Sequence, residues 1–306
     1  MKNVLLVGLL LCGTLWSFQS KAQYDPLYNQ YSFDQLMINP AYAGANDILT
    51  INTMYRRQWA GFEGAPETIT LSGHTSIAKN HAGIGAILIN ETFGVNKNME
   101  FYGSFSYKIN FGRGALSMGV SGGLLQYKYD YSKLNLEYLD DPSFLPEDEQ
   151  ISQANFGAGI WYQSDKYYIG VSVPRILEVE VDKPPFGTSN RYRRHIYLSG
   201  GGMITLNPTL KLKPYALVRI INGAPANIDL GASLLIKELI WAGVLVRDLD
   251  AIALVGQLEI SDKFRVGLSA EIATTKLVTE TYGTWELMLV LDFAAFNTQI
   301  LKRRYF

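Results

Sequence analysis

Apolar and polar residues alternate along most of the chain, in about fourteen segments that are separated by turn-forming residues. In the segment at 101–111, large apolar residues stand at odd-numbered positions: Phe101, Phe105, Tyr107, Ile109 and Phe111. A helix would not place them at period two, so the pattern predicts strands with one apolar and one polar face. The same alternation predicts strands at 48–59, 67–77, 82–90, 101–111, 116–129, 155–163, 167–173, 192–205, 210–220, 228–236, 239–246, 252–260, 264–272 and 284–293.

The connections between these strands alternate in length. Those after even-numbered strands are short, as in the sequence GRG at 112–114, whereas the two longest, at 130–153 and 174–191, follow odd-numbered strands. Closed barrels of bacterial outer membranes have short periplasmic turns and longer outer loops. We therefore expect an all-β fold, a transmembrane antiparallel β-barrel of about 14 strands at residues 47–293, located in the cell outer membrane.

Residues 1–22 have the pattern of an export signal. Lys2 precedes an uncharged apolar run at 4–18, which is short for a membrane-spanning helix, and the sequence SKA at 20–22 provides small residues for cleavage. We expect the mature chain to begin at Gln23. An uncleaved anchor helix is one alternative, and a lipoprotein attached at Cys12 is another, although Leu11 stands where a lipoprotein signal has a small residue.

Two further segments do not have the strand pattern. Residues 23–46 contain Pro26 and the sequence NPAYAG at 39–44, which would interrupt a ladder of hydrogen bonds, so we expect a periplasmic lead-in or a plug inside the barrel. Residues 294–306 include the sequence KRR at 302–304 and are too polar to continue in lipid. We expect a periplasmic C-terminal tail that either frays or contacts a partner.

Inward-facing charges need a place in such a barrel. Charged residues on the faces that we assign to the lumen include Lys211, Lys213, Arg219, Arg265 and Glu271. A charge that faces lipid costs about 2–4 kcal/mol at mid-depth. We therefore expect these side chains to form pairs within a filled lumen.

Composition removes several other classes of function. Basic and acidic residues nearly balance, at 27 and 28, and no basic patch stands out, so we expect no nucleic-acid partner. Cys12, the one cysteine, leaves with the signal, which excludes disulfides and thiolate metal sites in the mature chain. The histidines His74, His81 and His195 form no spaced metal motif. We expect no cofactor and no metal site.

Two local patterns have a chemical interpretation and a simpler one. Ser72 and His74 share a strand face, as a hydroxyl and its base do in an outer-membrane lipase. However, any two residues that are two positions apart in a strand share a face, so such pairs are common. We expect no catalytic residue and no enzyme activity. The acidic segment at 139–149 could bind calcium, but it lacks the spacing of a dedicated calcium loop, and a solvated surface loop is the simpler interpretation.

Three blocks of sequence resemble a known family. The sequence QYDPLYNQY at 23–31 and NPAYAG at 39–44 resemble the opening of mature PorP/SprF proteins. The sequence YRRQWAGFEGAPET at 55–68 is similar to their second characteristic block, and GIG at 83–85 with NETFG at 90–94 to a third. The residues that carry this resemblance, and that we consider possible partner contacts, are Asp25, Pro26, Tyr28, Gln30, Tyr31, Asn39, Pro40, Tyr42, Gly44, Tyr55, Arg56, Gln58, Trp59, Gly61, Gly64 and Pro66.

The resemblance implies a non-enzymatic outer-membrane component of the type IX secretion system of Bacteroidetes. Its implied partners are outer-membrane lipid, periplasmic ring or peptidoglycan-binding subunits and, in the SprF-like branch, a secreted gliding adhesin. The blocks also allow a structural interpretation, in which Trp59, Gly64 and Pro66 shape a loop at the barrel mouth. A transport channel for small hydrophobic molecules, similar to the plugged fatty-acid channels with fourteen strands, is the alternative function.

Overall fold

The structure is a computed structural model that describes residues 27–130, 149–180, 191–294 and 305–306. The strands are β1 (Leu49–Arg57), β2 (Glu67–Ile77), β3 (Ala82–Phe93), β4 (Asn96–Phe111), β5 (Gly114–Tyr129), β6 (Glu149–Ser164), β7 (Tyr167–Val173), β8 (Val179–Glu180), β9 (Arg191–Tyr192), β10 (His195–Gly202), β11 (Ile204–Asn207), β12 (Leu210–Ile221), β13 (Asn227–Ile236), β14 (Ile240–Arg247), β15 (Ala251–Ser261), β16 (Phe264–Ala273) and β17 (Thr284–Phe293). Short 3-10 turns are η1 (Gln35–Met37), η2 (Pro40–Tyr42), η3 (Ala78–Asn80) and η5 (Lys276–Thr279).

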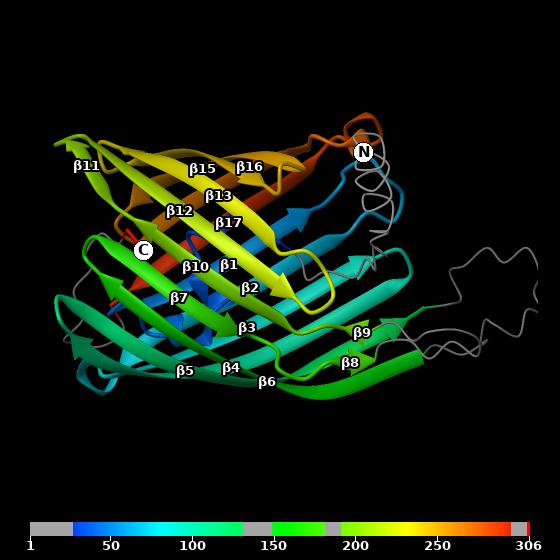
Figure 1. Ribbon diagram of the computed structural model, residues 1–306, viewed down its shortest axis with the longest axis horizontal. Helices are drawn as coiled ribbons and strands as arrows, with labels where there is room; N and C mark the ends of the chain where they lie inside the picture. Colours follow the sequence, from blue (N-terminus) through cyan, green and yellow to red (C-terminus); the bar gives the residue numbers. More distant parts are fainter. Residues whose placement is uncertain (1–26, 131–148, 181–190, 295–304) are drawn as a thin grey trace, which may run out of the picture.

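The strands form a closed antiparallel barrel (Figure 1). Successive strands of the wall pair with one another, with β10 between β7 and β12. β1 pairs with β17 from Leu49 opposite Phe293 to Arg57 opposite Trp285, which closes the ring. Because β10 and β11 continue one another beside β12, the wall contains fourteen strands. The predicted fold class and strand number are therefore confirmed.

The alternation in the sequence corresponds to the two faces of the wall. Along β17, buried and exposed residues alternate at every position: Glu286, Met288 and Val290 point into the lumen, while Leu287 and Leu289 point outward. Phe101, Phe105, Tyr107 and Phe111 of β4 also lie on the outer face, whereas Tyr102 points into the lumen. An apolar exterior around a polar interior is the pattern of a membrane barrel, whose strands satisfy all their backbone groups within the wall.

Several predicted strand boundaries were wrong. β4 begins at Asn96 rather than at 101. β6 begins at Glu149 rather than at 155, because β5 and β6 pair as far as Tyr129 opposite Glu149, at polar positions without the apolar alternation. The predicted strand at 192–205 is divided: β9 pairs with β8 outside the barrel sheet, and the wall strand is interrupted between β10 and β11. That interruption lies opposite Pro214, which has no N–H group to donate.

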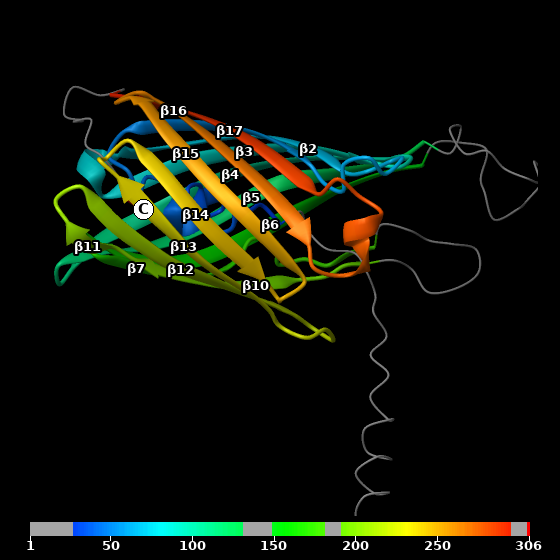
Figure 2. The same ribbon diagram turned by 90° about the horizontal axis from the view of Figure 1, so that it is seen from above.

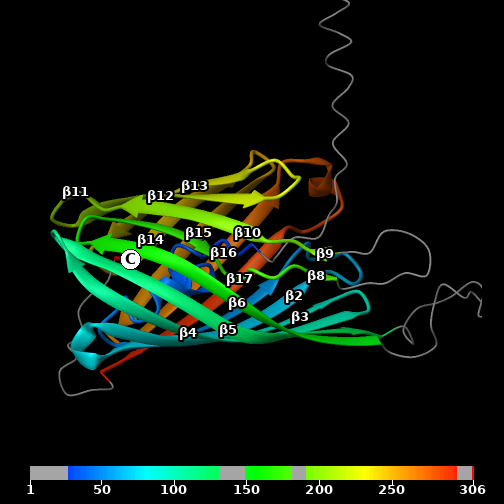
Figure 3. The same ribbon diagram turned by 60° about the horizontal axis from the view of Figure 1, so that its bottom comes forward.

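Residues 27–48 run inside the barrel rather than along its surface, and they contain η1 and η2 (Figure 3). Nearly all of these residues are buried. We call this segment the plug. The end of the barrel with the longer loops is the extracellular end, and the end with the short turns is the periplasmic one. The plug starts near the extracellular end, runs through the lumen and leads into β1 at the short-turn end. Within the described residues, no helix is both long and apolar enough to cross a membrane.

The barrel predicts a depth-dependent cost for a charge on its outer face. Phe105 lies in the middle of β4, and Phe111 is its last residue at the short-turn end. We expect Phe105→Arg to lower the free energy of unfolding in lipid vesicles by about 2–4 kcal/mol and Phe111→Arg by about 0–1 kcal/mol. Urea titration of both variants measures the difference. Equal losses at the two positions would contradict the proposed orientation of β4 in the bilayer.

Candidate functional site in the plugged lumen

The plug is built from tight turns that its own side chains cap. The carboxylate of Asp34 accepts a hydrogen bond from the Leu36 amide at 3.2 Å, at the start of η1. The side chain of Asn39 accepts one from the Ala41 amide at 2.9 Å, at the start of η2, where Pro40 occupies the first position. Such caps satisfy amides that lie too early in a turn for a backbone partner.

Glu286 of β17 joins the extracellular part of the plug to the wall. Its carboxylate accepts hydrogen bonds from the backbone amides of Asn29 at 2.8 Å and Gln30 at 3.2 Å. The same carboxylate pairs with the guanidinium of Arg56 at 2.7 Å, and the side chains of Arg56 and Glu286 are 2% and 0% exposed. A buried ion pair needs such additional hydrogen bonds to offset the loss of water. The plug amides therefore complete the solvation of this pair.

In the middle of the lumen, the plug contacts both sides of the wall. The Ser72 hydroxyl donates to the Asp34 carboxylate at 2.5 Å, and the Lys213 ammonium donates to the Ser32 carbonyl at 2.8 Å. The Lys213 ammonium also lies 5.2 Å from the ring centre of Phe33, within cation–π distance.

Towards the short-turn end, the wall binds the plug backbone. The His74 ring nitrogen Nδ1 accepts from the Gly44 amide at 3.2 Å, and the Lys108 ammonium donates to the Gly44 carbonyl at 2.7 Å. The Ser106 hydroxyl donates to the Ala43 carbonyl at 2.6 Å. Ser72 and His74, the two residues that resemble a lipase pair, thus each contact a different part of the plug.

Glycines of the wall leave room for the plug. A Cβ atom at Gly83 would lie 2.1 Å from the Ala43 carbonyl oxygen, and one at Gly119 would lie 2.4 Å from the Ala41 backbone. Both distances are shorter than any non-bonded contact, so larger residues at these positions would displace the plug. Gly44, with φ +68°, sits against Gly83 in a conformation that other residues adopt at a cost.

The last two residues of the chain also lie in the lumen. Phe306 is 8% exposed and packs edge-on against Tyr168, with 5.1 Å between ring centres. It belongs to the same apolar cluster as Leu36 and Tyr42 of the plug. The Tyr305 hydroxyl contacts Lys211 and the Glu238 carboxylate. Of the expected C-terminal tail, residues 295–304 lie outside the described part of the chain.

The expected pairing of inward charges is confirmed for three of the five residues. Arg265 pairs with Asp292 at 2.7 Å, and Lys211 with Glu238 at 2.5 Å. The carboxylate of Glu271 pairs with Arg247 at 2.7 Å. Arg219 contacts the Asn227 side chain at 2.7 Å, and Lys213 contacts the plug.

The second motif block forms the loop between β1 and β2 at the extracellular end. The Gln58 amide donates to the Pro66 carbonyl at 2.9 Å, which closes the loop. Ala60 forms two backbone hydrogen bonds with the loop before β17, to Tyr282 at 2.7 Å and Gly283 at 2.8 Å. Trp59, Gly61 and Gly64 have positive φ angles. The block therefore shapes a fixed loop.

The motif residues divide into two groups in space. Those inside the lumen are Tyr28, Gln30, Tyr31, Asn39, Pro40, Tyr42, Gly44 and Arg56. Those on the outer face or in the β1–β2 loop are Tyr55, Gln58, Trp59, Gly61, Gly64 and Pro66. Asp25 and Pro26 lie outside the described residues, as does most of the acidic segment at 139–149. Elsewhere in the described chain, no group of three His, Cys, Asp or Glu residues could hold a metal ion.

Sequence reasoning missed the wall residues that receive the plug. The sequence pattern assigned no role to Glu286 and did not predict the close approaches of the plug to Gly83 and Gly119. Glu286 could have been found by pairing the first predicted strand with the last, as closure of a barrel requires. This pairing puts the inward-facing Glu286 opposite Arg56.

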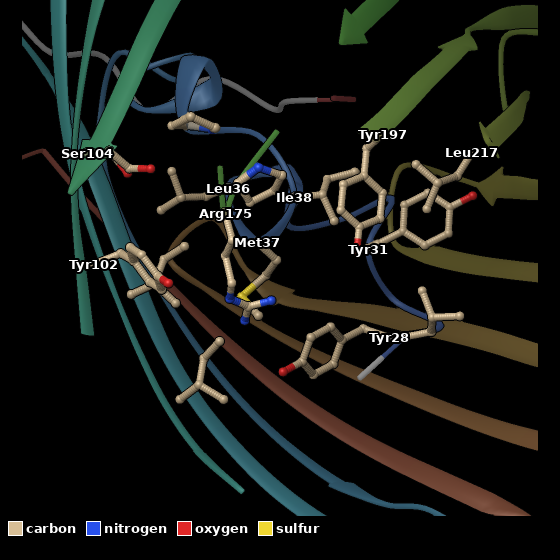
Figure 4. A pocket seen from close by; sticks show the side chains of 16 residues that line it. Tyr28, Tyr31, Leu36, Met37, Ile38, Tyr102, Ser104, Arg175, Tyr197 and Leu217 are labelled. Atoms are coloured by element: carbon tan, nitrogen blue, oxygen red, sulfur yellow. The ribbon is translucent and has the colours of Figure 1, made fainter. Parts of the chain in front are cut away.

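Little free space remains between plug and wall. One gap between the plug and the wall measures about 50 Å³ and lies between Tyr28, Tyr31 and Arg175, which Figure 4 shows converging from the plug and from the loop after β7. Arg175 is held there by Glu100 at 2.6 Å. Such a volume holds a few water molecules. At this level the plug therefore occupies most of the lumen.

A comparison of the sequence with protein-family models identifies the family of this plugged barrel. The model of the type IX secretion system membrane protein PorP/SprF matches residues 20–291. The chain belongs to the PorP/SprF family. The predicted family is thus confirmed, and with it a place among membrane proteins of type IX secretion. A search of curated protein sequences finds no match.

Several solved outer-membrane barrels are similar in shape to this PorP/SprF protein. Omp33 of Acinetobacter baumannii matches with a TM-score of 0.49 and 8% identity, over 82% of this chain and 100% of that one. The monoaromatic hydrocarbon channel CymD matches with a TM-score of 0.49 and 11% identity, over 87% and 91%. The P. putida toluene transporter TodX matches with a TM-score of 0.46 and 9% identity, over 85% and 94%.

Removing the Glu286 carboxylate should loosen the plug. Glu286→Gln leaves Arg56 buried without its charge partner, a change that costs about 3–5 kcal/mol. We expect faster maleimide labelling of a Ser32→Cys reporter, which replaces a fully buried plug hydroxyl. The control is Glu67→Gln, because the Arg57–Glu67 pair is half-exposed and should contribute little. Equal labelling rates in the two variants would contradict the role of Glu286.

Two glycines of β5 provide a second test of plug seating. Gly119→Ala places a methyl group 2.4 Å from the Ala41 backbone, whereas Gly122→Ala points outward with its nearest neighbour, Phe156, at 3.6 Å. We expect Gly119→Ala to destabilise the protein by about 1–3 kcal/mol and Gly122→Ala to be near neutral. Urea unfolding and the rate of proteolysis within the plug measure both effects. A neutral Gly119→Ala would show that the plug does not press on this wall.

Proposed function

We propose that this protein is a non-enzymatic outer-membrane barrel of the type IX secretion system that anchors periplasmic machinery or assists the secretion and attachment of a gliding adhesin. The observation that supports this most is the plugged lumen. Wall residues from β2, β4, β12 and β17 bind the plug, so the protein acts through its two ends and its outer face rather than through a pore.

The two ends of the barrel offer different surfaces to partners. At the extracellular end, the rigid β1–β2 loop exposes Phe62, which is 57% exposed, beside Tyr282, which is 81% exposed. Exposed aromatic residues on a fixed loop cost little ordering entropy when a partner binds. At the short-turn end, η3 exposes Lys79 close to the point where the plug enters β1. We propose that the adhesin binds the first surface and that periplasmic subunits bind the second.

The alternative function is transport of small hydrophobic molecules. It requires a continuous path through the lumen or sideways through the wall. Residues lining such a path would have to be apolar, whereas the described lumen contains buried pairs such as Arg56–Glu286 and Arg247–Asp229. Transport would therefore require the plug to leave its hydrogen bonds.

Site-specific photo-crosslinking in the native outer membrane tests the proposal. A crosslinking amino acid at Phe62 should capture a secreted or surface protein, and one at Lys79 should capture a periplasmic subunit of the secretion system. The control is Val120, which is 58% exposed on the outer face and should capture lipid. Mass spectrometry identifies the products. Capture of lipid alone at all three positions would contradict the proposed function.

Planar-bilayer recording separates the two functions. We expect the purified parent protein to show no steady conductance. Steady channels in the parent protein, or uptake of a hydrocarbon that is lost on deletion of the gene, would favour the transport alternative.

A further inference from the structure

The outer face of the barrel has an apolar groove across β14–β17, which lie side by side in Figure 2, and the adjoining β1. The groove measures about 540 Å³, ten times the gap inside the lumen. Its exposed lining is almost entirely carbon. The outward-facing residues that form it are Tyr55, Ala242, Leu254, Gly256, Ala270 and Leu268, with Trp285 and Leu287 at one end.

Strand register produces the groove. Ala242 lies opposite Gly256 across β14 and β15, and Gly256 lies opposite Leu268 across β15 and β16. One step nearer the extracellular end, Leu254 lies opposite Ala270. The small residues therefore follow a diagonal across three strands, and the two leucines stand on its sides.

The extracellular end of the groove has residues suited to the membrane surface. Trp285 and Tyr55 stand at this end, and the indole N–H of Trp285 donates to the Tyr282 carbonyl at 3.0 Å. Arg57 lies opposite Trp285, points outward and is half-exposed, with one guanidinium nitrogen 3.3 Å from Glu67. Tryptophan and tyrosine typically mark the level of lipid headgroups, and arginine has further N–H groups that can bind phosphate.

We propose that this groove binds one acyl chain of a phosphate-bearing lipid of the outer leaflet, with the lipid phosphate at Arg57. The groove opens to the hydrocarbon layer, where water does not enter, so an apolar chain fills it. The chain lies on Ala242, Gly256 and Ala270 between the two leucines. Glycerophospholipid and lipid A both carry a phosphate and acyl chains. This inference rests on the membrane barrel and is independent of the proposed secretion role.

Filling the groove tests this proposal. Gly256→Leu places a side chain in its floor without a backbone clash, because a Cβ atom there has no neighbour closer than 3.6 Å. Gly103→Leu is the matched control: Gly103 also faces outward, on β4, and its Cβ would have no neighbour closer than 4.0 Å. Native mass spectrometry of protein extracted in mild detergent counts the lipids retained, and the heat-modified gel shift confirms that each variant is folded.

We expect the parent protein and Gly103→Leu to retain one lipid, and Gly256→Leu to lose it at least several-fold. Arg57→Gln leaves the groove open and should lower retention of lipids with a phosphate while sparing neutral ones. The mass of the retained lipid distinguishes glycerophospholipid from lipid A. Equal retention in Gly256→Leu and Gly103→Leu would overturn the proposal, as would a membrane segment of a partner protein crosslinked to this face in place of lipid.

Discussion

Closure of the backbone hydrogen-bond ring between β1 and β17 is the constraint on which the other features depend. Backbone N–H and C=O groups have no partner in hydrocarbon, so a sheet with a free edge cannot remain there. Pairing of Leu49 with Phe293 through Arg57 with Trp285 removes both edges. It also brings Arg56 next to Glu286, and so it assembles the buried ion pair to which the plug amides bind.

A lumen of this kind has to be filled. The wall turns Arg56, Lys213, Asp229 and Glu271 inward, and buried charges without partners are strongly unfavourable. The plug supplies part of the missing partners with its own backbone, at Asn29, Gly44 and other positions. Because its polar contacts extend from the extracellular third of the barrel to the short-turn end, the plug is an integral part of the folded wall.

Much of the fold could be predicted because each strand carries its own local signal. The period-two pattern of β4 and β17, and the short turns after even-numbered strands, determine the barrel without knowledge of any contact. The start of β6 could not be located in this way, because it extends into a polar loop where neither face has to be apolar. Predicting the break opposite Pro214 would have required the register between β10 and β12, which the sequence pattern of either strand does not give.

The site was harder to predict than the fold for the same physical reason. The motif residues Tyr28, Asn39 and Gly44 were identified, but their partners Thr70, Ile160 and Lys108 lie far along the chain. The space for the plug is made by glycines such as Gly119, which look in the sequence like any other glycine in a strand. Burial of Phe306 was equally hidden, since a polar segment separates it from the barrel.

Hydrogen–deuterium exchange of the protein in lipid bilayers tests the plugged barrel most directly. If the plug is part of the folded wall, the amides of Asn29, Gln30 and Gly44 should exchange as slowly as those of β1 and β17, and orders of magnitude more slowly than those of the β1–β2 loop. Plug amides that exchange as fast as the loop, while the strands stay protected, would show an open lumen and contradict the central claim.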